Sequence, residues 1–183
     1  MITPITDLNE INKYIRQTLI TQSELDGGHI LNALSVRGQD LIKDIGDSIY
    51  MSYERKDCVI LYELMDNNSS TNLTMSEIDN SISSFSSYKV HITIYGNASM
   101  MMAQVLKARL ESEKVRNDLY VKGIYLENVT NAISLNDFIN ETLWHRTDFD
   151  IEISCLLKVE PVSNFDNFEE VQLEEPIEKE WLY

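Results

Sequence analysis

The densest group of reactive side chains lies in residues 144–160, which read WHRTDFDIEISCLLKVE. Within this stretch, Asp148 and Asp150 form an Asp-x-Asp pair. Two carboxylates at that spacing share one face of a strand and can hold Mg²⁺ or Mn²⁺ beside a nucleotide-sugar. Such metal sites belong with a nucleotide-binding βαβ unit, and the sequence contains none. The pair is therefore weighed against a purely structural interpretation.

Alternation along residues 146–160 favours the structural interpretation. Odd-numbered positions are mostly apolar: Thr147, Phe149, Ile151, Ile153, Cys155, Leu157 and Val159. Even-numbered positions are mostly polar: Arg146, Asp148, Asp150, Glu152, Ser154, Lys158 and Glu160, with Leu156 as the exception. A half-buried antiparallel strand requires this alternation. We expect Asp148, Asp150 and Glu152 to face solvent or to line an interface.

The histidines and cysteines do not form a recognisable catalytic or metal site. His29, His91 and His145 have no metal-ligand spacing among themselves or with Cys58 and Cys155, so we interpret them as surface or turn histidines. Cys155 points to the apolar face, where a thiol is inert. Two cysteines without a CxxC motif indicate a reducing cytoplasm. The sequence predicts no enzyme, no cofactor and no catalytic, cofactor-binding or metal-binding residue.

The chain is strongly acidic, with 30 Asp and Glu against 15 Lys and Arg and a net charge of −15. That charge repels free nucleic acid and anionic membrane surfaces. It serves solubility alone, or it provides a surface beside which a polyanion moves without sticking. The N-terminal residues carry acids where a secretory leader is positive, and no apolar run approaches about 18 residues, so we expect no membrane association.

The first third of the chain supplies one clear helix and one clear strand. Residues 7–22 predict an amphipathic helix with Asp7 as its cap, ended by the glycines of residues 24–29. Its apolar stripe comprises Leu8, Ile11, Ile15 and Leu19. Residues 30–46 fit either a helix or a strand, whereas residues 57–65 are β-branched and aromatic and predict a strand.

The central part combines a polar stretch with a strand–glycine–helix step. Twelve of the 21 residues in 67–87 are Ser or Asn, which predicts a long loop or an extended arm. Residues 88–95 alternate and predict a strand, after which Gly96 breaks the pattern and a helix begins near Ala98. We expect this helix to bury Met102, Val105, Leu106 and Leu110.

Further on, Ser112 caps a second, short helix that ends at Gly123, and a strand follows. Residues 133–145 predict a connecting segment with a short helix, and residues 167–174 predict a hairpin partner for the strand at 146–159. The whole describes an α+β fold: a mainly antiparallel sheet packed against an N-terminal helix and a central helix. We expect one domain over residues 1–173, with a Ser/Asn-rich insertion at 67–87 and a mobile acidic tail at 174–183.

The order of these features over residues 88–173 resembles the neck and tail-terminator family of long-tailed bacteriophages. The likeness lies in the step HITIYG into NASMMMAQVLKARLES, the segment EKVRNDLYVKGIYL and the late strand HRTDFDIEISCLLKV. The matching positions are Val115, Arg116, Leu119, Gly123, Arg146, Asp148 and Asp150. Residues 24–87 depart from that family, because they lack the proline-rich segment that its members often carry after the first helix.

This resemblance implies a tail-terminator-like structural virion protein that forms a ring, usually a hexamer. The ring would cap the tail tube, contact the tube protein and join it to the head-side connector or stopper protein, with DNA passing through the lumen. The protein would be assembled in the host cytoplasm. Two alternatives stay open: another connector or intracellular adaptor that binds protein, and an enzyme that uses Asp148 and Asp150 with a metal.

Overall fold

Two long neighbouring strands, β4 (Ile82–Tyr95) and β7 (Thr142–Val159), form the centre of the computed structural model. They run antiparallel in unbroken register from the pair Ile82–Val159 to the pair Tyr95–Arg146. The structure describes residue 5 and residues 7–34, 53–67, 72–75, 82–139 and 142–159.

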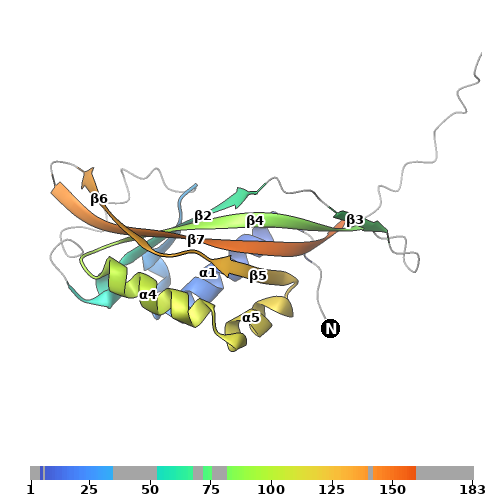
Figure 1. Cartoon of the computed structure of the whole chain (residues 1–183), viewed down its shortest axis with the longest axis horizontal. Helices are drawn as coiled ribbons and strands as arrows, with labels where there is room; N and C mark the ends of the chain where they lie inside the picture. Colours follow the sequence, from blue (N-terminus) through green and yellow to red (C-terminus); the bar gives the residue numbers. More distant parts are fainter. Residues whose placement is uncertain are drawn as a thin grey trace, which may run out of the picture.

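Shorter strands flank this central pair on both sides and complete a seven-stranded sheet (Figure 1). Along the outer edge of β4 lie β2 (Val59–Asp66) and β3 (Asn72–Met75), one after the other. Along the outer edge of β7 lie β5 (Ile124–Val129) and β6 (Ile133–Ile139). Strand β1 (Ile30–Asn32) pairs with β2 and makes the one parallel pairing among the seven described strands.

Three helices lie on the same side of the sheet (Figure 1): α1 (Leu8–Ser23), α4 (Ser99–Leu110) and α5 (Glu113–Tyr120). Two short 3-10 turns, η1 (Gly27–His29) and η2 (Arg55–Asp57), precede β1 and β2. The helices cover the sheet face that carries the alternating apolar side chains. The central members of this core are Ile11, Leu19, Ile60, Val90, Ile92, Ile94, Met102, Leu106, Leu119, Phe149, Ile151 and Ile153.

The sharp step from β4 into α4 depends on Gly96. Its φ of +132° lies in a region that side chains with a Cβ rarely adopt, and a Cβ there would lie 3.2 Å from Cys58 Sγ. The turn brings Ser99 onto β7, where the Thr147 hydroxyl donates to the Ser99 hydroxyl at 3.0 Å. Strand and helix therefore meet over the core without a connecting loop.

Most of the predicted elements are confirmed, including the mixed α+β fold. Asp7 caps α1 by accepting from the Asn9 amide, and Ser112 caps α5 by accepting from the Val115 amide. Gly123 follows α5 with a positive φ, as predicted. On β7 the predicted parity is correct, with Phe149, Ile151 and Ile153 buried.

Several local predictions are wrong. Residues 133–145 form β6 and the start of β7 and contain no helix in their described part, because β7 offers them a strand edge that the sequence does not reveal. Leu8 is half-exposed, so it does not join the α1 stripe. That helix ends at Glu24, which adopts a left-handed conformation, and the glycines after it form η1.

The Ser/Asn-rich stretch contains strands within its described residues. β3 occupies part of it, and residues 82–87 belong to β4, whose first residues (82–85) lie between β3 and β7. Small side chains such as those of Ser84 and Ser86 are buried here, because ladder hydrogen bonds on both sides compensate for the scarcity of apolar groups. Of residues 30–46, only 30–34 are described, and they begin with β1. The predicted hairpin at 167–174 and the tail at 174–183 lie outside the described residues.

Candidate functional site

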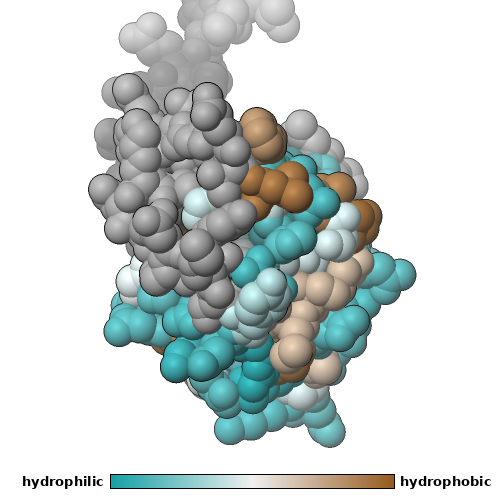
Figure 2. Space-filling view, turned by 90° about the vertical axis from the view of Figure 1, so that its left-hand side faces the viewer, coloured by the Kyte–Doolittle hydropathy of each residue, from teal (hydrophilic) through white to brown (hydrophobic). Residues whose placement is uncertain are grey.

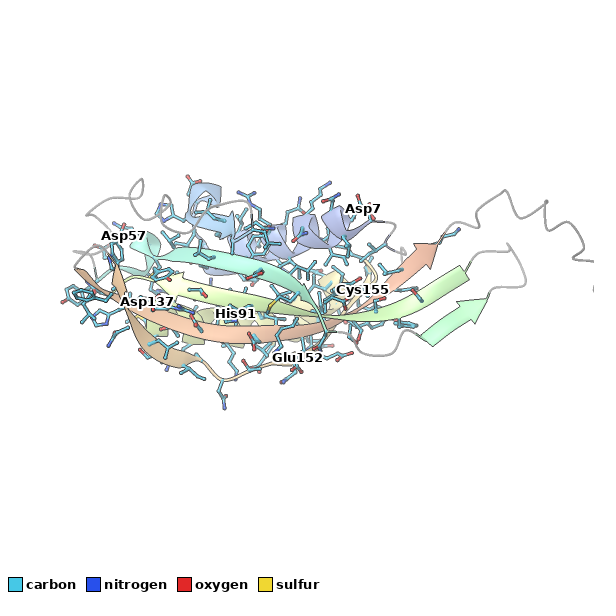
Figure 3. The ribbon with its side chains drawn as sticks, turned by 90° about the horizontal axis from the view of Figure 1, so that it is seen from above. Asp7, Asp57, His91, Asp137, Glu152 and Cys155 are labelled. Carbon is cyan, nitrogen blue, oxygen red and sulfur yellow. The ribbon has the colours of Figure 1, made fainter. Side chains whose placement is uncertain are left out.

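The sheet face opposite the helices carries a connected set of charged and polar side chains. Register places Tyr95 opposite Arg146, Thr93 opposite Asp148, and His91 opposite Asp150. Strands β6 and β7 form a hairpin at one end of the sheet. Strand β6 adds Asp137 at this end, while Glu152 lies further along β7 (Figure 3). We call the following residues the open-face network: Lys89, His91, Tyr95, Asp137, Arg146, Asp148 and Asp150.

Arg146 is the centre of this network. Its Nε and Nη2 donate to the two carboxylate oxygens of Asp148 at 2.8 and 2.5 Å, a bidentate pair. Its Nη1 donates to Asp137 at 2.9 Å, and the Tyr95 hydroxyl donates to the same Asp137 oxygen at 2.8 Å. One guanidinium therefore ties β6 to β7, and Tyr95 extends the link to β4.

The second part of the network surrounds Asp150. His91 Nδ1 lies 2.7 Å from Asp150 Oδ1, and Lys89 Nζ lies 3.2 Å from Asp150 Oδ2. His91 Nε2 is 3.8 Å from Asp148, so the imidazole lies between the two carboxylates of the Asp-x-Asp pair. The Asp150 amide also donates to the Thr130 hydroxyl at 2.8 Å. Each carboxylate thus has a cationic or hydrogen-bonding partner from a neighbouring strand.

The pKa shifts of the network residues agree with these contacts. Burial raises the pKa of Asp137, but hydrogen bonds from Arg146 and Tyr95 outweigh it and hold that pKa below its ordinary value. Burial likewise opposes the hydrogen bonds from His91 and Lys89, which lower the pKa of Asp150. The hydrogen bond to Asp148 raises the pKa of Arg146, and burial raises the pKa of Tyr95. All of these shifts favour the charged carboxylates and the neutral phenol at neutral pH.

Apolar side chains border the network at the end near the hairpin. Val59, Tyr95 and Trp144 are buried against one another, with Leu31 and Leu61 packed beside them. Next to this cluster is a hollow of about 200 Å³, whose lining includes Leu61, Glu63, His91, Tyr95 and Arg146. A larger hollow of about 340 Å³ lies between α1 and α5, where Gln17, Thr21, Asp118 and Lys122 are among its lining residues. Thr93 also lines the smaller hollow, where its hydroxyl lies 3.3 Å from His91 Nε2, so Thr93, His91 and Asp150 follow one another in the network.

The arrangement is a network of ion pairs and hydrogen bonds that links β4, β6 and β7. Within the described ranges, no group of three or more His, Cys, Asp or Glu residues could hold an ion. The Asp-x-Asp pair is contacted by the cations Arg146 and Lys89 and by the His91 imidazole. Both thiols are buried, and burial raises the pKa of Cys58 to about 11 and that of Cys155 to about 12. Among the described helices, none is long and apolar enough to cross a membrane.

The structure corrects two details of the sequence interpretation. Asp148 is buried beneath Arg146 instead of facing solvent, although it lies on the predicted face. His91 belongs to the network, whereas His29 sits in η1 with its Nδ1 3.0 Å from the Cys58 carbonyl oxygen, and His145 is exposed beside Asn136. Sequence reasoning missed Tyr95 and Asp137. The matching alternation of residues 88–95 and 146–153 was the one signal that could have placed Tyr95 beside Arg146.

Fold and site together define an α+β subunit whose described open face carries ion pairs between neighbouring strands. Comparison with known families gives the specific assignment: residues 53–177 match the phage neck terminator protein family, which is more than half of the 183-residue chain. The chain belongs to this family and is a structural component of the phage virion. The match begins before β2 and so extends beyond the resemblance seen over residues 88–173. Among curated proteins, none matches the chain.

Proposed function

We propose that this chain forms a closed ring, a hexamer, that terminates the tail tube and joins it to the head-side connector while DNA passes through the lumen. The observation that carries this proposal is the family match over residues 53–177. A neck terminator lies where the tail ends and the head begins, and a ring is the simplest assembly that leaves a central passage there. Cyclic closure requires one surface of each copy to meet a different surface of the next.

The charge of the chain supports passage of DNA. With a net charge of −15, a ring of six copies presents a strongly negative assembly to a polyanion. Basic surfaces bind phosphates through counterion release and would slow the DNA, whereas an acidic lumen repels them. The paired Lys89 and Arg146 fit this picture, because both are neutralised by carboxylates of the same sheet.

The proposed partners are a second copy of the chain, the tail tube protein and the head-side connector or stopper protein. We expect each contact between subunits to be weak in solution. Tube ends would then promote ring closure, since a template raises the effective concentration of neighbouring subunits. Assembly would take place in the host cytoplasm, before the head and the tail meet.

Deletion of the gene in a phage that carries it tests this function. We expect separate heads and tails, with tails of abnormal or unstable length, in electron micrographs of the lysate. Supplying the intact chain from a plasmid should restore joined, infectious particles. Joined and infectious particles that lack the protein would refute the proposal.

A further inference from the structure

Among the described strands, β6 lies at an edge of the sheet and has little of the usual protection against pairing. It is seven residues long and pairs with β7 in continuous register from Ile133–Asp148 to Ile139–Thr142. No other described strand pairs with its second edge. The sequence of β6, ISLNDFI, contains no Lys and no Pro, and its register has no bulge. Natural proteins normally use these devices to prevent an edge from pairing with another chain.

The same hairpin exposes large apolar side chains on both of its faces. The exposed fractions are 61% for Ile133, 43% for Leu135, 73% for Phe138 and 48% for Leu143. Ile133 and Leu135 share a face with Asp148 and Arg146, whereas Phe138 and Leu143 pair on the other face. Figure 2 looks onto the end where the hairpin projects in Figure 1, and apolar side chains gather at that end. A strand that is apolar on both faces is suited to burial on both.

Charge indicates which partner this edge accepts. Between Ile133 and Leu143, the sequence carries two charged residues, Asp137 and Glu141; Asp137 lies in the described part and forms an ion pair with Arg146, which it shares with Asp148. Two copies of a chain with a net charge of −15 repel each other wherever acidic surfaces meet, so copies associate most easily through a strip that is mainly apolar and carries few charges. A basic protein partner would instead be attracted to the acidic surfaces.

We propose that the open edge of β6, with Ile133, Leu135, Phe138 and Leu143, is the surface on which a second copy of this chain docks. This inference rests on the proposed ring and names one of its two contact surfaces. Backbone groups of the edge would pair with an extended segment of the neighbour, and the apolar side chains would be buried on either side. The links from Asp137 to Arg146 and Tyr95 hold the edge in place before contact, which lowers the entropy cost of docking.

Site-specific photocross-linking in assembled particles tests this surface. The chain would be supplied to the deletion phage with p-benzoylphenylalanine in place of Phe138, whose exposed ring tolerates the larger group. A matched control carries the same amino acid in place of Met101, which is 55% exposed on α4. After irradiation of purified virions, we expect cross-linked dimers of this chain from position 138 and none from position 101.

Other results of that experiment would overturn the inference while leaving the proposed function in place. Cross-links from position 138 to a different virion protein, cross-links only within one chain, or no cross-link would each show that another partner or none covers the edge. Absence of the protein from virions would contradict the proposed function itself.

A second measurement uses the variant Phe138→Glu, which places a charge in the strip. We expect it to fold with an unchanged circular dichroism spectrum but to lose complementation of the deletion phage. The control Met101→Glu should complement fully. Normal complementation by Phe138→Glu would contradict the docking role of β6 without touching the ring itself.

Discussion

Replacing Arg146 with Met removes the centre of the open-face network and keeps a side chain of similar length. The change breaks the two hydrogen bonds to Asp148, at 2.8 and 2.5 Å, and the one to Asp137 at 2.9 Å. Asp148 is 9% exposed, and the partner that remains for its carboxylate is the His91 imidazole, with Nε2 at 3.8 Å. The variant therefore leaves a buried carboxylate with one distant partner.

The size of the effect follows from burial. Removing one member of a fully buried ion pair costs about 3–5 kcal/mol, because the other charge stays buried without compensation. Arg146 retains 26% of its side-chain exposure, so water partly replaces it and reduces that cost. We expect a loss of about 2–4 kcal/mol in the free energy of unfolding, a large share of the roughly 5–15 kcal/mol typical of a domain.

Urea unfolding followed by circular dichroism measures this loss. With an m-value of about 2 kcal/mol per molar urea, the midpoint should fall by about 1–2 M. Lys56→Met is the matched control, because it removes the same charge from an exposed pair with Glu54 and should leave the midpoint unchanged. The double variant Arg146→Met with Asp148→Asn should recover part of the loss, since an amide costs less to bury than a carboxylate.

Two outcomes would refute this reasoning. A midpoint for Arg146→Met equal to that of Lys56→Met would show that the network contributes no net stability. A double variant no more stable than Arg146→Met would show that the cost does not come from the unpaired Asp148. The first outcome would mean that the network orients the β6–β7 hairpin without adding stability.

Three further predictions concern the strand parity, the glycine step and the response to acid. Ile151→Asp should lower the free energy of unfolding by several kcal/mol (about 3–5), because it buries an unpaired charge, whereas Asp150→Asn on the opposite, partly exposed face should keep the fold and lower the urea midpoint far less. Gly96→Ala should lower the free energy of unfolding by about 1–3 kcal/mol in the same assay, because the position has a positive φ and an added Cβ would contact Cys58. A variant as stable as the parent would show that the turn can adjust without cost. Because the pKa values of Asp137 and Asp150 are lowered in the folded state, their stabilisation is present above the ordinary Asp pKa of 3.8 and is lost as pH falls through the folded values. Urea midpoints at pH 6 and pH 3 should therefore differ less for Asp137→Asn than for the parent, and an equal difference would contradict this account.

Local pattern was sufficient for the elements whose burial follows a simple period. Alternation along residues 88–95 and 146–159 predicted two strands and the buried face of each, and Ile92 and Ile151 lie in the core as expected. Caps at Asp7 and Ser112 predicted the starts of two helices. These signals work because a strand with one buried face and a helix with one buried stripe impose their periods directly on the residue types. The family resemblance also came from such local features, whereas the division into one domain with an insertion and a tail stays a prediction.

Tertiary structure decided the rest. The sequence of β6 predicts a connecting segment with a short helix, because its apolar residues lie on both faces and show no period of two; pairing with the edge of β7 makes it a strand. The Ser-rich start of β4 is a strand for a similar reason: it pairs with β3, the strand just before it, and with β7, which is distant in sequence. The charges of Asp137 and Arg146 are visible in the sequence, but their contact is not, because the distance between two side chains on different strands depends on register. Register is set by which residues the whole sheet can bury together, and no single strand contains that information.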